Sequence, residues 1–189
     1  MKKIGIIFAM NEELNELLRI MSLKRKYSIY DLTFYECDDT NNNNKCILVE
    51  SGIGKVNAAR ATQILIDNEK VDYIFNIGVA GALTDTINIC DMVIGEQFVQ
   101  HDFDLTPFNY KKGIIPNLKE SIKSDNYLIS LTKDIPSDTA IHYGVIASGD
   151  QFINDKTRSN SIRKNFGASC VEMEGAAIAQ VCHLCNIPF

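Results

Sequence analysis

The sequence lacks an excess of basic residues, since 19 Lys and Arg stand against 24 Asp and Glu and give a formal net charge of -5. Proteins that bind nucleic acid or an anionic membrane normally carry a basic face. The sequence also lacks any apolar run near the roughly 18 residues that a membrane span needs. We therefore expect neither a nucleic-acid partner nor a membrane partner.

The apolar run near the N-terminus is too short for a secretory signal. It extends from Ile4 to Met10, is interrupted by Asn11, Glu12 and Glu13, and leads to no small-residue cleavage site. Without export, the six cysteines, scattered through apolar segments, are expected to be reduced thiols of the core. The sequence thus predicts a cytoplasmic protein.

The ligand pairs of a zinc site are missing as well. Only Cys182-His183-Leu184-Cys185 has a suggestive spacing, and no second pair is placed to complete four ligands. A thioredoxin-like motif would lie at a strand-to-helix junction, whereas this segment falls late in a predicted helix. We expect no metal and no cofactor.

Short apolar runs alternate with helical patterns along the chain, which predicts an α/β fold in a single domain over residues 1–189. The predicted strands are 3–8, 27–37, 45–50, 73–77, 92–99, 139–146 and 168–171, with an Asn-rich hairpin tip at 38–44. One predicted helix begins near Asn11, which is its expected N-cap, and a second begins at Lys55. Three further helices are predicted over 124–134, 155–166 and 174–184. Ile187-Pro188-Phe189 has the pattern of the start of another buried strand. We therefore expect a C-terminal strand and helix beyond this sequence.

Gly52-Ile53-Gly54-Lys55 suggests a phosphate-binding loop at first sight. The Walker pattern needs four residues between its two glycines, and it needs Ser or Thr directly after the Lys. The dinucleotide pattern needs a third small residue at the position where Asn57 stands. A tight turn that uses the backbone freedom of glycine is the better interpretation.

Acidic residues occur at two candidate sites. Glu12 and Glu13 fall in the first turn of a helix, where the helix dipole favours acids. Glu172 and Glu174 flank Met173 between a short strand and an Ala-rich helix, in an otherwise apolar stretch. Because buried carboxylates need partners, one of this pair either faces a cavity or polar ligand or stabilises the helix N-terminus.

Two further residues admit a functional and a structural interpretation. Phe152 closes the polar turn that begins at Ser148, where an exposed ring could stack on a base, although a buried ring is the commoner outcome. His101 could be a catalytic imidazole or a hydrogen-bonded structural one, and the absence of an obvious nucleophile favours the structural role.

The motifs become specific when they are taken together and in order. The set comprises Gly5–Glu13, Ser51–Ala59, Gly78–Gly81, His101–Asp104, Ser148–Ile153 and Val171–Ala176. In this order and spacing the whole chain resembles the bacterial 5′-methylthioadenosine/S-adenosylhomocysteine nucleosidases. The resemblance implies a three-layer nucleoside phosphorylase-like fold, with a central mixed, partly barrel-like sheet flanked by helices. It also implies hydrolysis of the N-glycosidic bond of an adenine nucleoside.

The resemblance also assigns residues. It implies that Glu13 activates the attacking water, that Glu174 and Met173 contact the ribose, that Phe152 stacks on adenine and that the backbone of Ile153 binds the base. The expected substrate-binding positions are Ala9, Met10, Ile53, Val79, Phe152, Ile153, Glu172, Met173 and Glu174. Leu105, Phe108 and Pro116 occupy positions that complete the 5′ pocket of a partner subunit, which implies a homodimer.

These roles suit the chemistry. Cleavage of an N-glycosidic bond builds positive charge on the ribose and needs a base for water on one face and an acid for the leaving group on the other. Glu13 is the predicted base, and Glu174 would stabilise the sugar hydroxyls and the developing cation. The family's leaving-group acid is an Asp beyond Phe189, so no residue of this sequence is assigned that role. Val79 stands where the family usually has Ser.

Two alternatives remain open at this stage. A purine nucleoside phosphorylase shares the fold but needs a cationic phosphate pocket, whereas Phe8-Ala9-Met10 is bulky and apolar with no Arg nearby. The chain could also be an inactive, truncated nucleoside-binding fragment.

Overall fold

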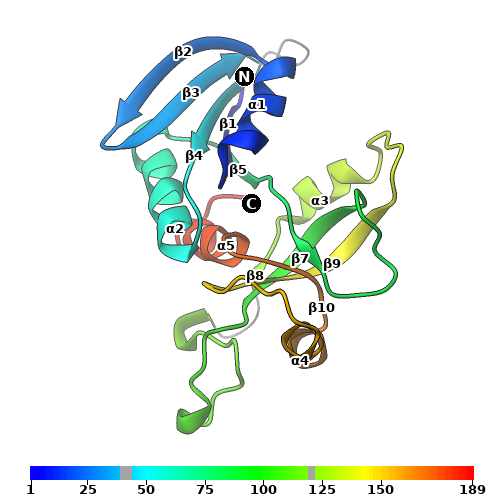
Figure 1. Cartoon of the computed structure of the whole chain (residues 1–189). Helices are drawn as coiled ribbons and strands as arrows, with labels where there is room; N and C mark the ends of the chain where they lie inside the picture. Colours follow the sequence, from blue (N-terminus) through cyan, green and yellow to red (C-terminus); the bar gives the residue numbers. More distant parts are fainter. Residues whose placement is uncertain (39–43, 119–121) are drawn as a thin grey trace. The chain divides into compact units, whose positions relative to one another are not determined.

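The computed structural model describes residues 1–38, 44–118 and 122–189 (Figure 1). Its contacts divide the chain into two compact units, Met1–Gly78 with Gln180–Phe189 and Val79–Ala179. Each unit contains one five-stranded mixed sheet with helices, which confirms the predicted α/β class. Neither sheet closes into a barrel among the strands described. The prediction of a single domain stays a prediction, and most of the Asn-rich tip lies outside the described residues.

The first unit is built on a sheet in the order β2-β3-β4-β1-β5, whose β1 is parallel to both β4 and β5. Its elements are β1 (Lys3–Phe8), α1 (Asn11–Ile20), β2 (Ser22–Ile29), β3 (Leu32–Asp38), β4 (Lys45–Glu50), α2 (Lys55–Ile64), the π-helical turn η1 (Leu65–Glu69) and β5 (Tyr73–Asn76). The prediction of one strand over 27–37 was wrong. The chain turns at Tyr30 and Asp31, where Tyr30 adopts a φ of 55°, and β2 and β3 form a hairpin instead.

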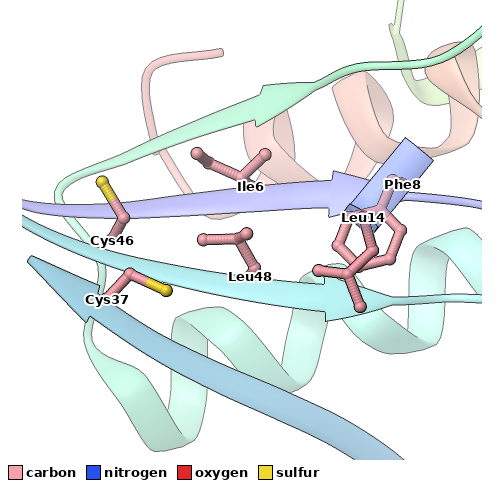
Figure 2. Packing of buried hydrophobic residues seen from close by; sticks show 6 residues of the cluster. All are labelled: Ile6, Phe8, Leu14, Cys37, Cys46 and Leu48. Atoms are coloured by element: carbon pink, nitrogen blue, oxygen red, sulfur yellow. The ribbon is translucent and has the colours of Figure 1, made fainter. Parts of the chain in front are cut away.

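The core of this unit contains side chains from both faces of β1. Alternate residues of β1, Ile6 and Phe8, pack with Leu14 of α1 and with Leu48 of β4 (Figure 2). On the opposite face Gly5 lies against Leu65. A Cβ built on Gly5 would come within 3.1 Å of the Leu65 side chain. Burial on both faces explains why β1 is apolar from Ile4 to Phe8.

The second unit is built on a sheet in the order β6-β10-β9-β7-β8. Its elements are β6 (Gly81–Ala82), β7 (Met92–Gln100), the 3₁₀ turns η2 (Thr106–Phe108) and η3 (Pro116–Leu118), β8 (Ile122–Lys123), α3 (Asn126–Thr132), β9 (Ile141–Ser148), α4 (Lys156–Phe166), β10 (Ala168–Glu172) and α5 (Gly175–Leu184), which continues into the first unit. Strands β7, β9 and β10 are parallel, and their register places Gln100 beside Ser148 and Ser148 beside Glu172. The carboxyl ends of these strands therefore meet at one edge of the sheet, where α/β proteins place their ligands.

The predicted helices of this unit are present with slightly shorter bounds. Asp125 and Asp155 cap α3 and α4, and their side chains accept hydrogen bonds from backbone N–H groups of the first turn. No helix in the described parts of the chain is long and apolar enough to span a membrane.

Candidate functional site

Glu13 lies in the first turn of α1 and is held by the chain just before that helix. One carboxylate oxygen, Oε2, accepts hydrogen bonds from the backbone nitrogens of Ala9 at 3.0 Å and Met10 at 3.1 Å. The N-cap of α1 is Met10, so the prediction of Asn11 as the cap was wrong. The side chain three residues after the cap reaches back instead, as the acid of a capping box does.

The other carboxylate oxygen of Glu13 faces the turn after β5. A Cβ built on Gly78 would lie 3.1 Å from Glu13 Oε1, which is tighter than most real contacts. Glu13 is itself half-buried, and glycine at position 78 avoids a close contact between a side chain and this oxygen of the carboxylate.

The turn between β4 and α2 follows the carboxyl end of β4 in the same unit. Gly52 and Gly54 adopt φ values of 80° and 100°, which confirms the interpretation as a tight turn. The Ser51 hydroxyl donates to the carbonyl of Gly52 at 2.8 Å, and the Asn57 amide donates to the carbonyl of Ile53 at 2.7 Å. These bonds hold the backbone of the turn while the Ile53 side chain stays 55% exposed.

In the second unit, backbone hydrogen bonds join the ends of β7, β9 and β10. The N–H of His101 donates to the carbonyl of Ser148 at 2.9 Å, and the N–H of Gly149 donates to the carbonyl of Glu172 at 3.2 Å. His101 is buried, and a Cβ on Gly149 would lie only 2.4 Å from its Nε2. The imidazole thus packs directly on the glycine, and the structural role of His101 stays a prediction.

Glu172 lies at the end of β10, and its carboxylate accepts hydrogen bonds from three protein groups. The Ser148 hydroxyl donates to Oε1, while the backbone nitrogens of Glu174 and Gly175 donate to Oε2 at 2.8 Å and 2.6 Å. Burial raises the pKa of Glu172, and the three donors act against that shift. Of the two acids that flank Met173, Glu172 is the one that stabilises the helix N-terminus, and Glu174 is a buried residue.

The remaining predicted substrate contacts differ in exposure. Phe152 is 81% exposed after β9, whereas Ile153 is half-buried and packs against the core cluster that contains Ala147 and Val171. Val79 is 73% exposed, and Met173 is half-buried. An exposed ring beside an anchored neighbour is the arrangement that base stacking at residue 152 requires.

The predicted partner-subunit residues lie in the segment after β7. Leu105 is half-buried immediately before η2, Phe108 ends that turn with 72% of its surface exposed, and Pro116 begins η3 and is exposed.

The cysteines are all free thiols, as the sequence predicts, but the prediction that all six belong to the core was wrong, because Cys90 is exposed and Cys185 is only half-buried. Burial raises the pKa of Cys182 to about 12, so its thiol stays protonated at neutral pH and is a poor metal ligand or nucleophile. The Cys185 thiol donates to the side-chain oxygen of Gln63 at 3.7 Å. No group of three or more His, Cys, Asp or Glu side chains is placed to hold a metal ion in the part of the chain that the structure describes.

The structure thus places the predicted residues in two groups. Ala9, Met10, Glu13 and Ile53 gather in the first unit, and the others belong to the second. The sequence assigned no role to Ser148, which donates a hydrogen bond to Glu172, or to Gly78, which lies beside Glu13. Their only signal was membership of the Ser148–Ile153 and Gly78–Gly81 motifs.

Comparison with known proteins gives consistent results. Residues 3–189 match the family model of the phosphorylase superfamily. A 5′-methylthioadenosine/S-adenosylhomocysteine nucleosidase of Exiguobacterium is 39% identical over 99% of this chain and 81% of the relative. The crystal structure of such a nucleosidase of Helicobacter pylori, with 5′-methylthioadenosine in its active site, superposes with a TM-score of 0.93 at 36% identity, over 100% of this chain and 82% of that one. A futalosine hydrolase of the same organism has a TM-score of 0.92 at 34% identity, over 100% of this chain and 86% of that one.

Proposed function

Because the chain belongs to the phosphorylase superfamily, and within it to the methylthioadenosine/S-adenosylhomocysteine nucleosidases, we propose that it hydrolyses the N-glycosidic bond of these nucleosides. The products are adenine and the 5′-thioribose, a reaction of methionine salvage that also removes S-adenosylhomocysteine. The observation that carries the proposal is the 39% identity to a nucleosidase over 99% of the chain. We place the protein in the cytoplasm, where these nucleosides arise.

Glu13 is the base of the proposed reaction. Its carboxylate is ordered by the backbone N–H groups of Ala9 and Met10, which donate to Oε2, while Oε1 faces Gly78. A base that is fixed before substrate binds loses little entropy when it abstracts a proton, and a positioned base contributes about 10²- to 10⁴-fold in rate.

The second unit supplies the proposed contacts to the nucleoside. Glu174 binds the ribose hydroxyls together with Met173, and its charge stabilises the positive ribose of the transition state. The exposed ring of Phe152 stacks on adenine, and the anchored backbone of Ile153 binds the base edge. Val79 lies near the sugar without the hydroxyl that Ser would bring.

The 5′ substituent is the apolar part of the substrate. Ala9, Met10 and Ile53 line its pocket in one subunit, and Leu105, Phe108 and Pro116 complete it from the other subunit of a homodimer. An apolar sleeve of this kind suits the thioether that both nucleosides carry.

The loop after β1 favours water over phosphate as the nucleophile. A phosphorylase needs cationic groups or exposed N–H groups to hold phosphate. Here the N–H groups of Ala9 and Met10 already donate to the Glu13 carboxylate, so an anion at this loop would meet negative charge.

The test is adenine release from 5′-methylthioadenosine, measured with the purified protein in the presence and absence of phosphate, with futalosine as a competing substrate. We expect release that does not depend on phosphate and a preference for methylthioadenosine. Strict phosphate dependence would show a phosphorylase instead. Tight nucleoside binding without release of adenine would show that the chain acts only as a nucleoside-binding protein.

A further inference from the structure

Ser148 and Glu172 face each other at the carboxyl ends of two neighbouring parallel strands, β9 and β10. The two residues are register partners, and Ser148 is completely buried. A buried hydroxyl needs a hydrogen-bond partner, and this one both donates to Glu172 Oε1 and accepts from the backbone nitrogen of Ala176 at 2.7 Å.

Together the two side chains take up three consecutive N–H groups at the start of α5. Glu172 accepts from the nitrogens of Glu174 and Gly175, and Ser148 accepts from the nitrogen of Ala176. The first N–H groups of a helix have no partner within the helix, and side chains outside it can satisfy them, as Glu172 and Ser148 do here. The backbone around Glu174 is therefore tied to the ends of two strands of the sheet.

An ionised carboxylate offers about four acceptor positions, and three donors of the protein already occupy Glu172. Only about one acceptor position of Glu172 is left for a sugar hydroxyl. Glu174 begins the same turn and is itself buried at the edge where the strands end. The carboxylate of Glu172 is thus held by protein donors at the start of the turn that Glu174 begins.

We propose that Ser148 and Glu172 are positioning residues, which hold the first turn of α5 so that the carboxylate of Glu174 is oriented toward the ribose. The inference rests on the proposed function, because it concerns how that site binds its sugar. It assigns Glu172 an indirect role, through Glu174, in place of contact with the substrate.

The experiment compares Ser148→Ala with Ser124→Ala in the full-length protein. Ser124 is a half-buried residue of the same unit whose hydroxyl donates to the carbonyl of Gly95 at 2.6 Å, so this control removes one hydrogen bond away from α5. Each variant is also given Glu13→Gln, which stops turnover, and calorimetry then gives the affinities for 5′-methylthioadenosine and for adenine alone. We expect Ser148→Ala to weaken nucleoside binding by about 10-fold and to leave adenine binding unchanged, since adenine does not reach Glu174. Ser124→Ala should change neither affinity.

A general loss of structure would weaken both ligands equally, so the ratio of the two affinities separates positioning from folding. Glu172→Gln, which keeps the shape and part of the hydrogen bonding, should give an intermediate loss of nucleoside affinity. In a Glu174→Ala background the Ser148→Ala change should have no further effect, because its consequence passes through the absent carboxylate.

Two results would overturn the inference: equal effects of Ser148→Ala and Ser124→Ala, or additive losses in the double variant. Failure of the proposed function would look different. In that case the unsubstituted protein itself would neither bind 5′-methylthioadenosine nor release adenine.

Discussion

At the scale of single residues, the chemistry depends on carboxylates with distinct partners. Glu13 is ordered by two backbone N–H groups, and Glu172 by two backbone N–H groups and a hydroxyl. Hydrogen bonds of this kind fix a carboxylate before any substrate arrives, which is what preorganisation requires.

The residue-scale prediction concerns Glu13→Gln in the full-length protein. The Gln side-chain oxygen can still accept from Ala9 and Met10, so we expect the fold and nucleoside binding to be retained. Gln cannot take a proton from water, and kcat should fall by about 10²-fold or more. Steady-state kinetics and calorimetry with 5′-methylthioadenosine measure the two quantities. Loss of binding together with turnover would contradict the assigned role of Glu13 as a base.

At the scale of elements, the N-terminal ends of β7 and β9 are joined by a contact between the side chains of Asp91 and His142. Asp91, just before β7, accepts from the backbone nitrogen of Asn88 at 2.8 Å and lies 3.0 Å from His142 Nε2 of β9. The hydrogen bond from Asn88 and the contact with His142 hold the pKa of Asp91 below its usual range. An acid whose pKa is lower in the folded state stabilises that state above its unfolded pKa. This contribution disappears as the pH falls through the folded pKa.

We therefore expect the unfolding midpoint to fall as the pH is lowered from about 5 to about 2, and Asp91 to contribute to that fall. Asp91→Asn should lower the midpoint at neutral pH and flatten the dependence on pH. Asp85→Asn, at an exposed position of the same unit, is the control. Calorimetric melts of the three proteins across this range check the prediction. Parallel curves for Asp91→Asn and the unsubstituted protein would refute it.

At the scale of the whole molecule, the proposed homodimer has a consequence for activity. If Phe108 completes the pocket of the other subunit, Glu13→Gln and Phe108→Asp impair a site from different chains. Co-expression of the two variants would give mixed dimers with one unaltered site, and random pairing would restore about a quarter of the sites. Neither variant alone should turn over substrate well, because a charge at residue 108 disturbs an apolar sleeve. Adenine release by the mixture measures this, and its absence would place Phe108 in the pocket of its own chain.

The strands and helices followed largely from local pattern. β1 and β4 have the predicted bounds, and α4 and α5 begin one residue later than predicted. β1 could be predicted from its continuous apolar run, which arises because both faces of that strand are buried. The pattern failed at Tyr30 and Asp31, where a two-residue turn separates β2 from β3 without glycine or proline to mark it.

The sequence by itself determined the α/β class, the family and the identity of the candidate acids, because periodicity and ordered motifs are properties of the chain. Only the tertiary structure decided how the acids differ. Glu172 and Glu174 are equivalent by composition and stand two residues apart, but the pairing of β9 with β10 brings Ser148 to one of them. Hydrogen bonds between residues 24 positions apart depend on strand register, and that register is set by packing across the sheet, which no short motif records.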